Sequence, residues 1–206
     1  MKRVSLWGIV ICSLLSVGGY SLTSQAAAPE NKKSTSKHHL RENPEELLAW
    51  ASDYLTSLHT LTARFTQTTS DGREASGALS VQKPGLLHVQ YDPPSTLEIT
   101  ADGKSVMISD KRLKTRDVYS IGQTPLKFLL KEKLDFTQDV RVLNVQKDAH
   151  DGFNITFNDS STLGGTSRIT LMFAPQKANP LTQWIIRDPQ GYETTFTLSR
   201  VSTTER

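Results

Sequence analysis

The chain has 206 residues, which is enough for one domain with a sizeable hydrophobic core. It carries 24 Lys and Arg against 21 Asp and Glu, but residues 44–206 taken alone have a net charge of −1. This balance gives no support for a nucleic-acid partner. The only cysteine, Cys12, lies near the N-terminus, so the domain has neither disulfide bonds nor thiol chemistry.

The first 28 residues have the layout of a secretory signal peptide. Lys2 and Arg3 precede an apolar run, which ends in three consecutive alanines. The run is shorter than the roughly 20 apolar residues that span a bilayer, which disfavours a membrane anchor. Residues 29–43 are polar, charged and aperiodic, so we expect a flexible linker there. We predict an exported protein whose single domain covers residues 44–206.

A helix is predicted at the start of the domain, over residues 44 to about 59. Asn43 can cap it, Pro44 suits the first helical position, and Glu45 and Glu46 suit the positive end of the helix dipole. Apolar residues then recur at positions 47, 48, 51, 55 and 58, which is helical spacing. We expect this stripe to pack on a sheet.

From residue 61 onward the hydrophobic period becomes two. Turn dipeptides such as Asp71-Gly72, Asp102-Gly103 and Gln190-Gly191 interrupt it, as they do in β-hairpins. The segments between the turns are strand candidates, namely 61–69, 77–83, 86–92, 96–100, 105–109, 114–121, 140–146, 153–158, 167–174, 182–188 and 192–200. They predict an antiparallel sheet of many strands.

One further helix is predicted at residues 124–133, with Thr124 as its cap and Pro125 at its start. Two helices cannot cover both faces of so many strands, so the sheet must curl until its apolar face is enclosed. We therefore predict a mainly β fold, an unclosed antiparallel β-barrel made of one highly curved sheet, with an α-helical lid that encloses a hydrophobic cavity.

No catalytic or metal-binding motif is found in the sequence. There is no GxSxG turn, no HExxH, no EF-hand loop and no glycine-rich phosphate loop. His59, His88 and His150 are far apart along the chain. We expect a protein that is not an enzyme and that has no metal and no cofactor.

The segments LTARFTQ, GALSVQKPGLLHVQYDPP, ITADGKSVMISD and QTPLKFLL follow one another in an order and spacing that resembles the periplasmic outer-membrane lipoprotein carrier family, LolA. The resemblance covers residues 47 to about 200. It implies a carrier in the periplasm that receives acylated lipoproteins from an inner-membrane ABC transporter. It also implies delivery to an outer-membrane acceptor lipoprotein, with the acyl chains held in the hydrophobic cavity. We expect a monomer.

Lys83 is the candidate lid latch. It matches the basic residue before proline that is usually arginine in the family and that ties the lid to the barrel. The period-two count through Leu79 and Val81 points its side chain inward. The alternative is that Lys83, at the end of its strand, extends into solvent. A lysine at this position offers a flexible point charge in place of arginine's planar fork of donors.

Two further groups of residues are assigned from the resemblance and from strand alternation. The candidate acyl-chain cavity comprises Phe65, Leu79, Val81, Leu87, Val89, Tyr91, Leu97, Ile99, Trp184, Ile186 and Phe196. The candidate lid residues are Leu47, Leu48, Leu55, Leu126, Leu129 and Leu130. Each of these apolar residues can equally belong to an ordinary closed core.

Two other functions remain open at this stage. A periplasmic binding module of the same fold could carry another lipid or sense mislocalised lipoproteins, and an exported hydrolase could use an unrecognised site. The sequence also departs from the family at its end. Related chains commonly continue into an FxFxxP pattern, whereas this one ends in VSTTER, so we expect the acceptor either to differ or to be absent.

Overall fold

The computed structural model describes residues 43–160 and 164–206. The predicted signal peptide and all of the predicted linker except Asn43 lie outside these residues. The first helix, α1 (Pro44–Ser57), begins as predicted, because the Asn43 side chain accepts a hydrogen bond of 3.1 Å from the Glu45 N–H. The helix ends two residues earlier than expected, since Leu58 already pairs with Glu205 in a strand.

All eleven predicted strands are present. Their bounds are β1 (Leu58–Thr69), β2 (Glu74–Gln82), β3 (Leu86–Tyr91), β4 (Leu97–Asp102), β5 (Ser105–Asp110), β6 (Thr115–Ser120), β7 (Arg141–Lys147), β8 (Phe153–Asp159), β9 (Ser167–Phe173), β10 (Leu181–Arg187) and β11 (Glu193–Glu205). They form one antiparallel sheet in the order β6-β5-β4-β3-β2-β1-β11-β10-β9-β8-β7. Strands β6 and β7 are its two edges and do not pair with each other, so the barrel is unclosed, as predicted.

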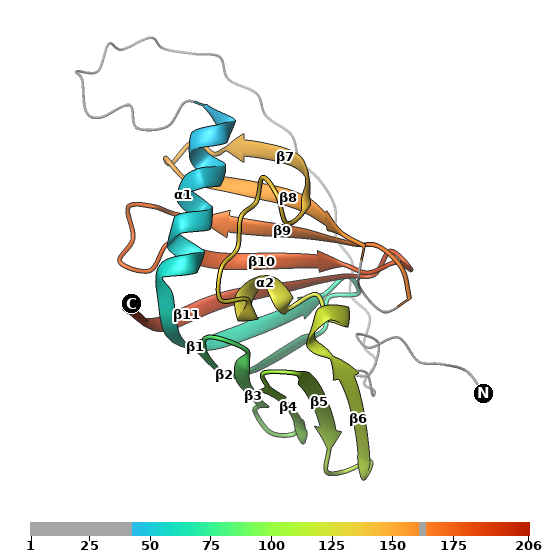
Figure 1. Cartoon of the computed structure of the whole chain (residues 1–206). Coiled ribbons are helices and arrows are strands. Elements are labelled where there is room, and N and C mark those ends of the chain that lie inside the picture. Colours follow the sequence, from blue (N-terminus) through green and yellow to red (C-terminus); the bar gives the residue numbers. More distant parts are fainter. Residues whose placement is uncertain (1–42, 161–163) are drawn as a thin grey trace, which may run out of the picture.

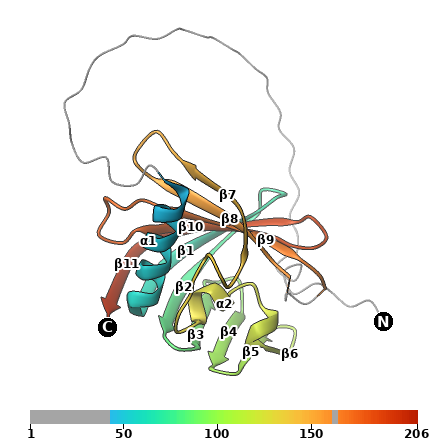
Figure 2. The same ribbon diagram turned by 45° about the horizontal axis from the view of Figure 1, so that its top comes forward.

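The sheet curls around the face that the helices cover (Figures 1 and 2). Strands β7 to β10 lie roughly side by side, while β3 to β6 turn away from them, so the sheet is strongly bent. The hydrogen-bonded pair β1 and β11 joins the two parts, and it brings the C-terminus beside the end of α1, since Leu58 pairs with Glu205. Residues 201–205 extend β11 beyond the predicted strand end at residue 200.

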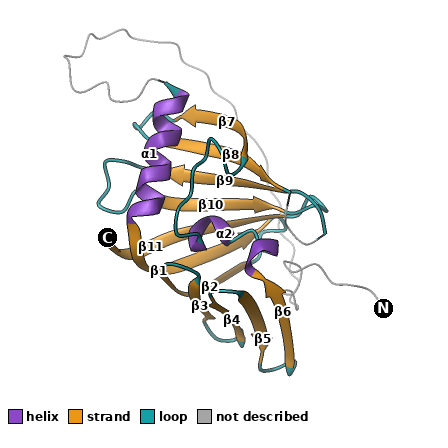
Figure 3. Ribbon diagram, in the orientation of Figure 1, coloured by secondary structure: helices purple, strands orange, loops and turns teal. Residues whose placement is uncertain are grey.

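The second helix is much shorter than predicted. A 3₁₀ turn, η1 (Ile121–Gln123), precedes α2 (Lys127–Leu130), and the backbone becomes extended at Lys131. Residues 131–140, which we call the strap, then cross toward β7 (Figure 3). Leu134 and Phe136 alternate with exposed residues and are buried at 3% and 0% exposure, so the strap behaves as an extended segment with period two. The lid consists of α1, η1, α2 and the strap.

The core lies between the curled sheet and the lid. Alternate residues of β8 and β9 face inward, and the stripe of α1 is buried as predicted. Trp50 and Tyr54 of α1 place their rings against Phe173 of β9, with centroids 5.9 and 6.2 Å apart. Among the described helices, none combines the length and the apolar character needed to cross a membrane.

Candidate functional site

The turn between β2 and β3 brings a buried lysine against the end of a helix. Lys83 is only 3% exposed, so its predicted inward direction is confirmed and the solvent-exposed alternative is wrong. Its Nζ donates a hydrogen bond to the backbone carbonyl of Leu55. This carbonyl lies in the last turn of α1, where helix carbonyls lack helical partners and the helix dipole is negative. The ammonium group therefore supplies a donor to the Leu55 carbonyl and places a positive charge at the negative end of the helix dipole.

The charge state of Lys83 is set by its surroundings. Burial, with a smaller contribution from the positive charge of Arg206, lowers the pKa of Lys83 from 10.5 to about 8. The Arg206 guanidinium also donates to the Lys83 carbonyl at 3.2 Å and to Glu132 of the strap at 2.8 Å. We call residues 83–85 the latch turn. The end of β11, the latch turn and the strap are therefore joined in one polar network.

The same turn contacts the other helix of the lid. The Gly85 N–H donates to the Leu130 carbonyl at the end of α2, at 2.9 Å. Gly85 has φ +78, and a Cβ at this position would lie 2.6 Å from the Cα of Gly103 in the next turn. Only glycine adopts this positive φ without strain and also leaves room for the backbone of Gly103. One three-residue turn thus holds the C-terminal ends of both lid helices.

The start of α2 is fastened to the opposite part of the sheet. Lys127 forms an ion pair of 2.6 Å with Asp159, at the end of β8, and the Asp159 side chain is 1% exposed. Because α2 is held by β8 at one end and by the β2–β3 turn at the other, it bridges the two parts of the bent sheet. Sequence reasoning missed this pair, because nothing in the spacing of 127 and 159 indicates their contact.

The strap is fastened to α1 by hydroxyl groups spaced one helical turn apart. The Phe136 N–H donates to Ser52 Oγ at 3.0 Å, and the Leu134 N–H donates to Thr56 Oγ1 at 3.2 Å. These hydroxyls provide the partners that the strap's backbone would otherwise find only in a helix or sheet. These two N–H groups of the strap are therefore satisfied although the predicted second helix stops at Leu130.

A row of aromatic side chains crosses the interior beneath the lid. The rings of Tyr91, Phe65, Phe196, Trp184 and Phe128 contact one another in that order, with centroids 5.1, 6.0, 5.3 and 6.0 Å apart. The row connects β3, β1, β11 and β10 to α2. We call these five residues the aromatic row. The sequence analysis assigned four of them to the cavity and left out Phe128, the residue by which the lid joins the row.

The interior also contains a few polar groups. The Tyr91 hydroxyl donates to Gln67 Oε1, and both residues are buried. Burial raises the pKa of Tyr91 well above its usual range, so the phenol stays neutral. Among the described residues, no hydrogen-bond partner is found for Trp184 Nε1, although this nitrogen is buried. An unsatisfied buried donor costs about 1–3 kcal/mol, so this N–H can gain from a bound carbonyl group.

The predicted cavity residues share the enclosed interior. All of them are buried except Ile99, which is partly exposed and packs against the core. All six predicted lid residues are buried as well, although Leu126 lies just before α2 rather than in it. The structure therefore brings the two groups together in a closed arrangement. Which of these residues contact cargo stays a prediction.

Within residues 43–160 and 164–206 there is no cluster of three or more His, Cys, Asp or Glu side chains that could hold a metal ion. The imidazole of His88 contacts Glu98 at 2.8 Å on the outer face of the sheet. Most polar groups of the site instead fasten the lid, and the interior beneath it is apolar apart from Gln67, the Tyr91 hydroxyl and Trp184 Nε1.

The comparison with protein families agrees with this geometry. The family described as outer membrane lipoprotein carrier protein LolA matches residues 56–206. This chain belongs to the LolA family. The match includes all eleven strands, the latch turn and α2, but only the last two residues of α1.

The chain is also similar to individual proteins of the LolA family. It is 25% identical over 135 residues to the outer-membrane lipoprotein carrier protein of Pseudomonas entomophila, and the alignment covers 61% of this chain and 65% of that protein. It is 33% identical over 81 residues to the protein of that name from Pseudomonas fluorescens, covering 37% and 39%. The chain thus spans less than two thirds of the length of these relatives. A DUF1329 family protein from Desulfovibrio piger superposes with a TM-score of 0.49 at 10% identity, covering 76% of this chain and 90% of that one.

Proposed function

We propose that this protein is a periplasmic carrier that receives acylated lipoproteins from an inner-membrane ABC transporter and takes them toward the outer membrane. Residues 1–28 would direct its export and be removed. The observation that carries the proposal is the enclosed apolar interior, whose lid is fastened to the sheet by a few polar contacts, chiefly those of the β2–β3 turn and the Lys127–Asp159 ion pair. No step of this function requires chemistry on the cargo, so the protein acts as a binding protein and not as an enzyme.

The energetics favour such an escort. A triacylated cargo with chains of roughly 16 carbons exposes about 48 methylene groups, which amounts to about 40 kcal/mol in gross terms at about 0.8 kcal/mol each. The polar contacts of the latch turn are much weaker, and acyl chains can replace the apolar contacts that the buried lid residues lose on opening. The charge-assisted bond of Lys83 is worth about 1.5–3 kcal/mol and the bond of Gly85 about 1 kcal/mol. Entry of acyl chains can therefore open the lid, and release of the chains lets it close again.

The same comparison of free energies supports a latch role for Lys83. When the lid opens, Leu55 and Lys83 separate, and both return to partners in water. The closed state thus competes with bound cargo, which helps the cargo to leave. The donor of Trp184, in the aromatic row beneath α2, is available to an ester or amide carbonyl of the cargo.

The experiment that tests the carrier function is native mass spectrometry of the processed protein after it is mixed with energised membranes that contain the lipoprotein-releasing transporter. A one-to-one adduct with an acylated lipoprotein is expected. An adduct with a free lipid would favour the related binding module instead. Absence of any adduct would reject the carrier function and return a hydrolase or a structural role to consideration.

The latch is tested separately in a transfer assay. Lys83→Leu is expected to give a folded protein that accepts lipoprotein and hands it on poorly, because the closed lid no longer competes with cargo. Lys83→Arg serves as the matched control and is expected to be tolerated, since its guanidinium also donates to carbonyls. Transfer by the leucine variant at the wild-type rate would show that the bond to Leu55 has no part in release.

A further inference from the structure

A second surface, remote from the lid, concentrates the positive charge of the domain. Residues 111–116, which form the turn after β5 and the first two residues of β6, contain Lys111, Arg112, Lys114 and Arg116 and no acidic residue. Because residues 44–206 carry a net charge of −1, the rest of the domain has a charge of −5. All six residues of this segment are exposed. We call it the β5–β6 tip.

The β5–β6 tip has a fixed shape. Asp110 Oδ1 accepts hydrogen bonds from the N–H groups of Arg112 and Leu113, at 2.9 and 3.1 Å, and from the Thr96 hydroxyl at 2.7 Å. The Thr96 hydroxyl bond, followed by these backbone bonds, lowers the pKa of Asp110, so the carboxylate stays ionised. Asp110 is only 8% exposed, and its charge is directed into the turn rather than toward solvent. The turn therefore presents a leucine, Leu113, that is 51% exposed between cations.

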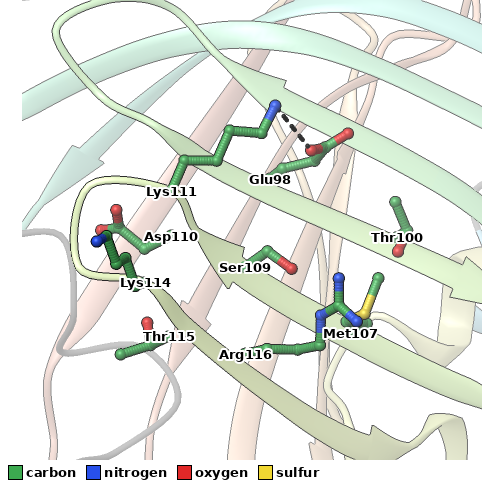
Figure 4. Close-up of a pocket in the computed structure, with 9 residues that line it drawn as sticks. All are labelled: Glu98, Thr100, Met107, Ser109, Asp110, Lys111, Lys114, Thr115 and Arg116. Atoms are coloured by element: carbon green, nitrogen blue, oxygen red, sulfur yellow. Dashed lines mark ion pairs between the residues drawn. The ribbon is translucent and has the colours of Figure 1, made fainter.

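The outer face beside the tip extends the same surface. Lys111, Lys114 and Arg116 border a hollow of about 350 Å³ above Ser109 and Met107 (Figure 4). Two acidic side chains also line the hollow: Glu98 pairs with Lys111 at 3.5 Å, and Asp110 is bonded to the turn and to Thr96 as described above. A second exposed apolar residue, Val118 at 60% exposure, lies across from Met107 on β6. Cations thus surround exposed apolar groups along one hairpin.

We propose that the β5–β6 tip is a docking surface for an anionic phospholipid bilayer. Lysine and arginine near such a surface each contribute through attraction to anionic headgroups, and an apolar side chain between them can enter the boundary of the acyl region. The exposed Leu113 favours a bilayer over an acidic protein. The acyl boundary of a bilayer offers this side chain an apolar environment, whereas a surface of acidic side chains does not. The inference does not depend on the carrier function.

The tip can be altered without touching the lid. The last four residues of β6 separate it from η1, which corresponds to about 13 Å of extended chain (Figure 1). None of the four cations of the tip contacts the latch turn or the aromatic row in a hydrogen bond, ion pair or ring contact found among the described residues. Changes at the tip therefore leave the closed lid intact.

The test is vesicle flotation of the processed protein, residues 29–206, with liposomes that contain 30 mol% phosphatidylglycerol in phosphatidylcholine, against pure phosphatidylcholine. We expect binding to the anionic vesicles only, and weaker binding at high salt, because exposed charges are screened. The variant Lys111→Gln/Arg112→Gln/Lys114→Gln is expected to bind on the order of a hundredfold more weakly, at about fivefold per cation removed. Failure of the wild-type chain to bind anionic vesicles would overturn the proposal.

A matched control removes the same charge elsewhere. The variant Arg141→Gln/Lys147→Gln/Arg168→Gln changes three exposed residues of β7 and β9, at the other edge of the sheet. It also leaves the basic N-terminal segment unchanged, as the tip variant does, so that segment cannot account for a difference between them. We expect the control to keep nearly all of its binding. Equal losses in the two variants would show that only net charge matters and would overturn the docking surface.

Insertion of the leucine is tested with Leu113→Trp. The fluorescence of the added tryptophan is expected to shift to shorter wavelength on anionic vesicles, after subtraction of the wild-type signal. Tryptophan at the exposed tip does not disturb the core, so folding is retained. Binding without a shift would overturn the insertion of this side chain and with it the preference for a bilayer over an acidic protein.

Discussion

Raising the pH above neutrality is expected to stabilise the folded protein through Lys83. The pKa of this residue is about 8 in the folded protein and 10.5 in an unfolded chain. Between these two values the unfolded state binds more protons at Lys83 than the folded state, so the free energy of unfolding rises with pH. At about 1.36 kcal/mol per pH unit, the complete gain is on the order of 3 kcal/mol, of which about 2 kcal/mol is reached at pH 9.5. Below pH 8 this contribution is absent.

The assay is urea unfolding at a series of pH values from 7 to 9.5, for the wild type, Lys83→Leu and Lys83→Arg. Other titrating groups are common to all three proteins, so differences between their unfolding free energies isolate position 83. The wild type is expected to gain about 2 kcal/mol relative to each variant across this range. Arginine cannot lose its proton there, and leucine has none, so neither variant shares the gain.

The reasoning would be refuted if the three proteins showed parallel pH profiles. A wild type that lost stability relative to Lys83→Leu would also refute it. That result would mean that the charge of the ammonium strengthens its bond to Leu55 by more than burial of the charge costs. In both cases the pKa of Lys83 in the folded protein would have to lie near or above its usual value.

Further predictions concern the surroundings of the latch and the interior. Replacing Arg206 by Gln removes a positive charge near Lys83, so the pKa of Lys83 should rise and the pH-dependent gain should begin at higher pH, in the same urea titration. Gly77→Ala is expected to destabilise the protein by about 1–3 kcal/mol, because a Cβ there would clash with the Gln90 carbonyl oxygen of β3 and would lie 2.6 Å from Cζ of Phe65; a melting temperature equal to the wild type would contradict this close packing. Lys127→Met is expected to cost about 2 kcal/mol, because it removes an ion-pair partner of the buried Asp159, whereas the exposed Lys133→Met should cost almost nothing in the same thermal unfolding experiment.

Much of the fold could be predicted because its signals are local. Alternation of apolar and polar residues between turn dipeptides gave every strand, and the Asn43 cap gave the start of α1. The same alternation placed Lys83 on the inner face. The second helix was overestimated because Leu129, Leu130, Leu134 and Phe136 fit both a helix and an extended segment. Their alternation after Lys131 was the only signal for the strap.

The contacts between the lid and the sheet could not be predicted in this way. Leu55 lies 28 residues before Lys83, and Lys127 lies 32 residues before Asp159. No periodicity connects positions that belong to different elements, so their contact depends on how the sheet bends and where the lid lies. The contact of Phe128 with Trp184 has the same origin, since it exists only because α2 crosses the strands beneath it.

The amino-acid sequence by itself determined the strands, the turns, the first helix and the inward direction of the latch lysine, because each depends on neighbouring residues and on the two periods of regular structure. The tertiary structure decided what the lysine binds, where the helical lid ends, and how the aromatic rings form one row. The physical reason is that these features satisfy orphan backbone groups and fill space between elements, and both needs arise only when the sheet curls and the lid covers it.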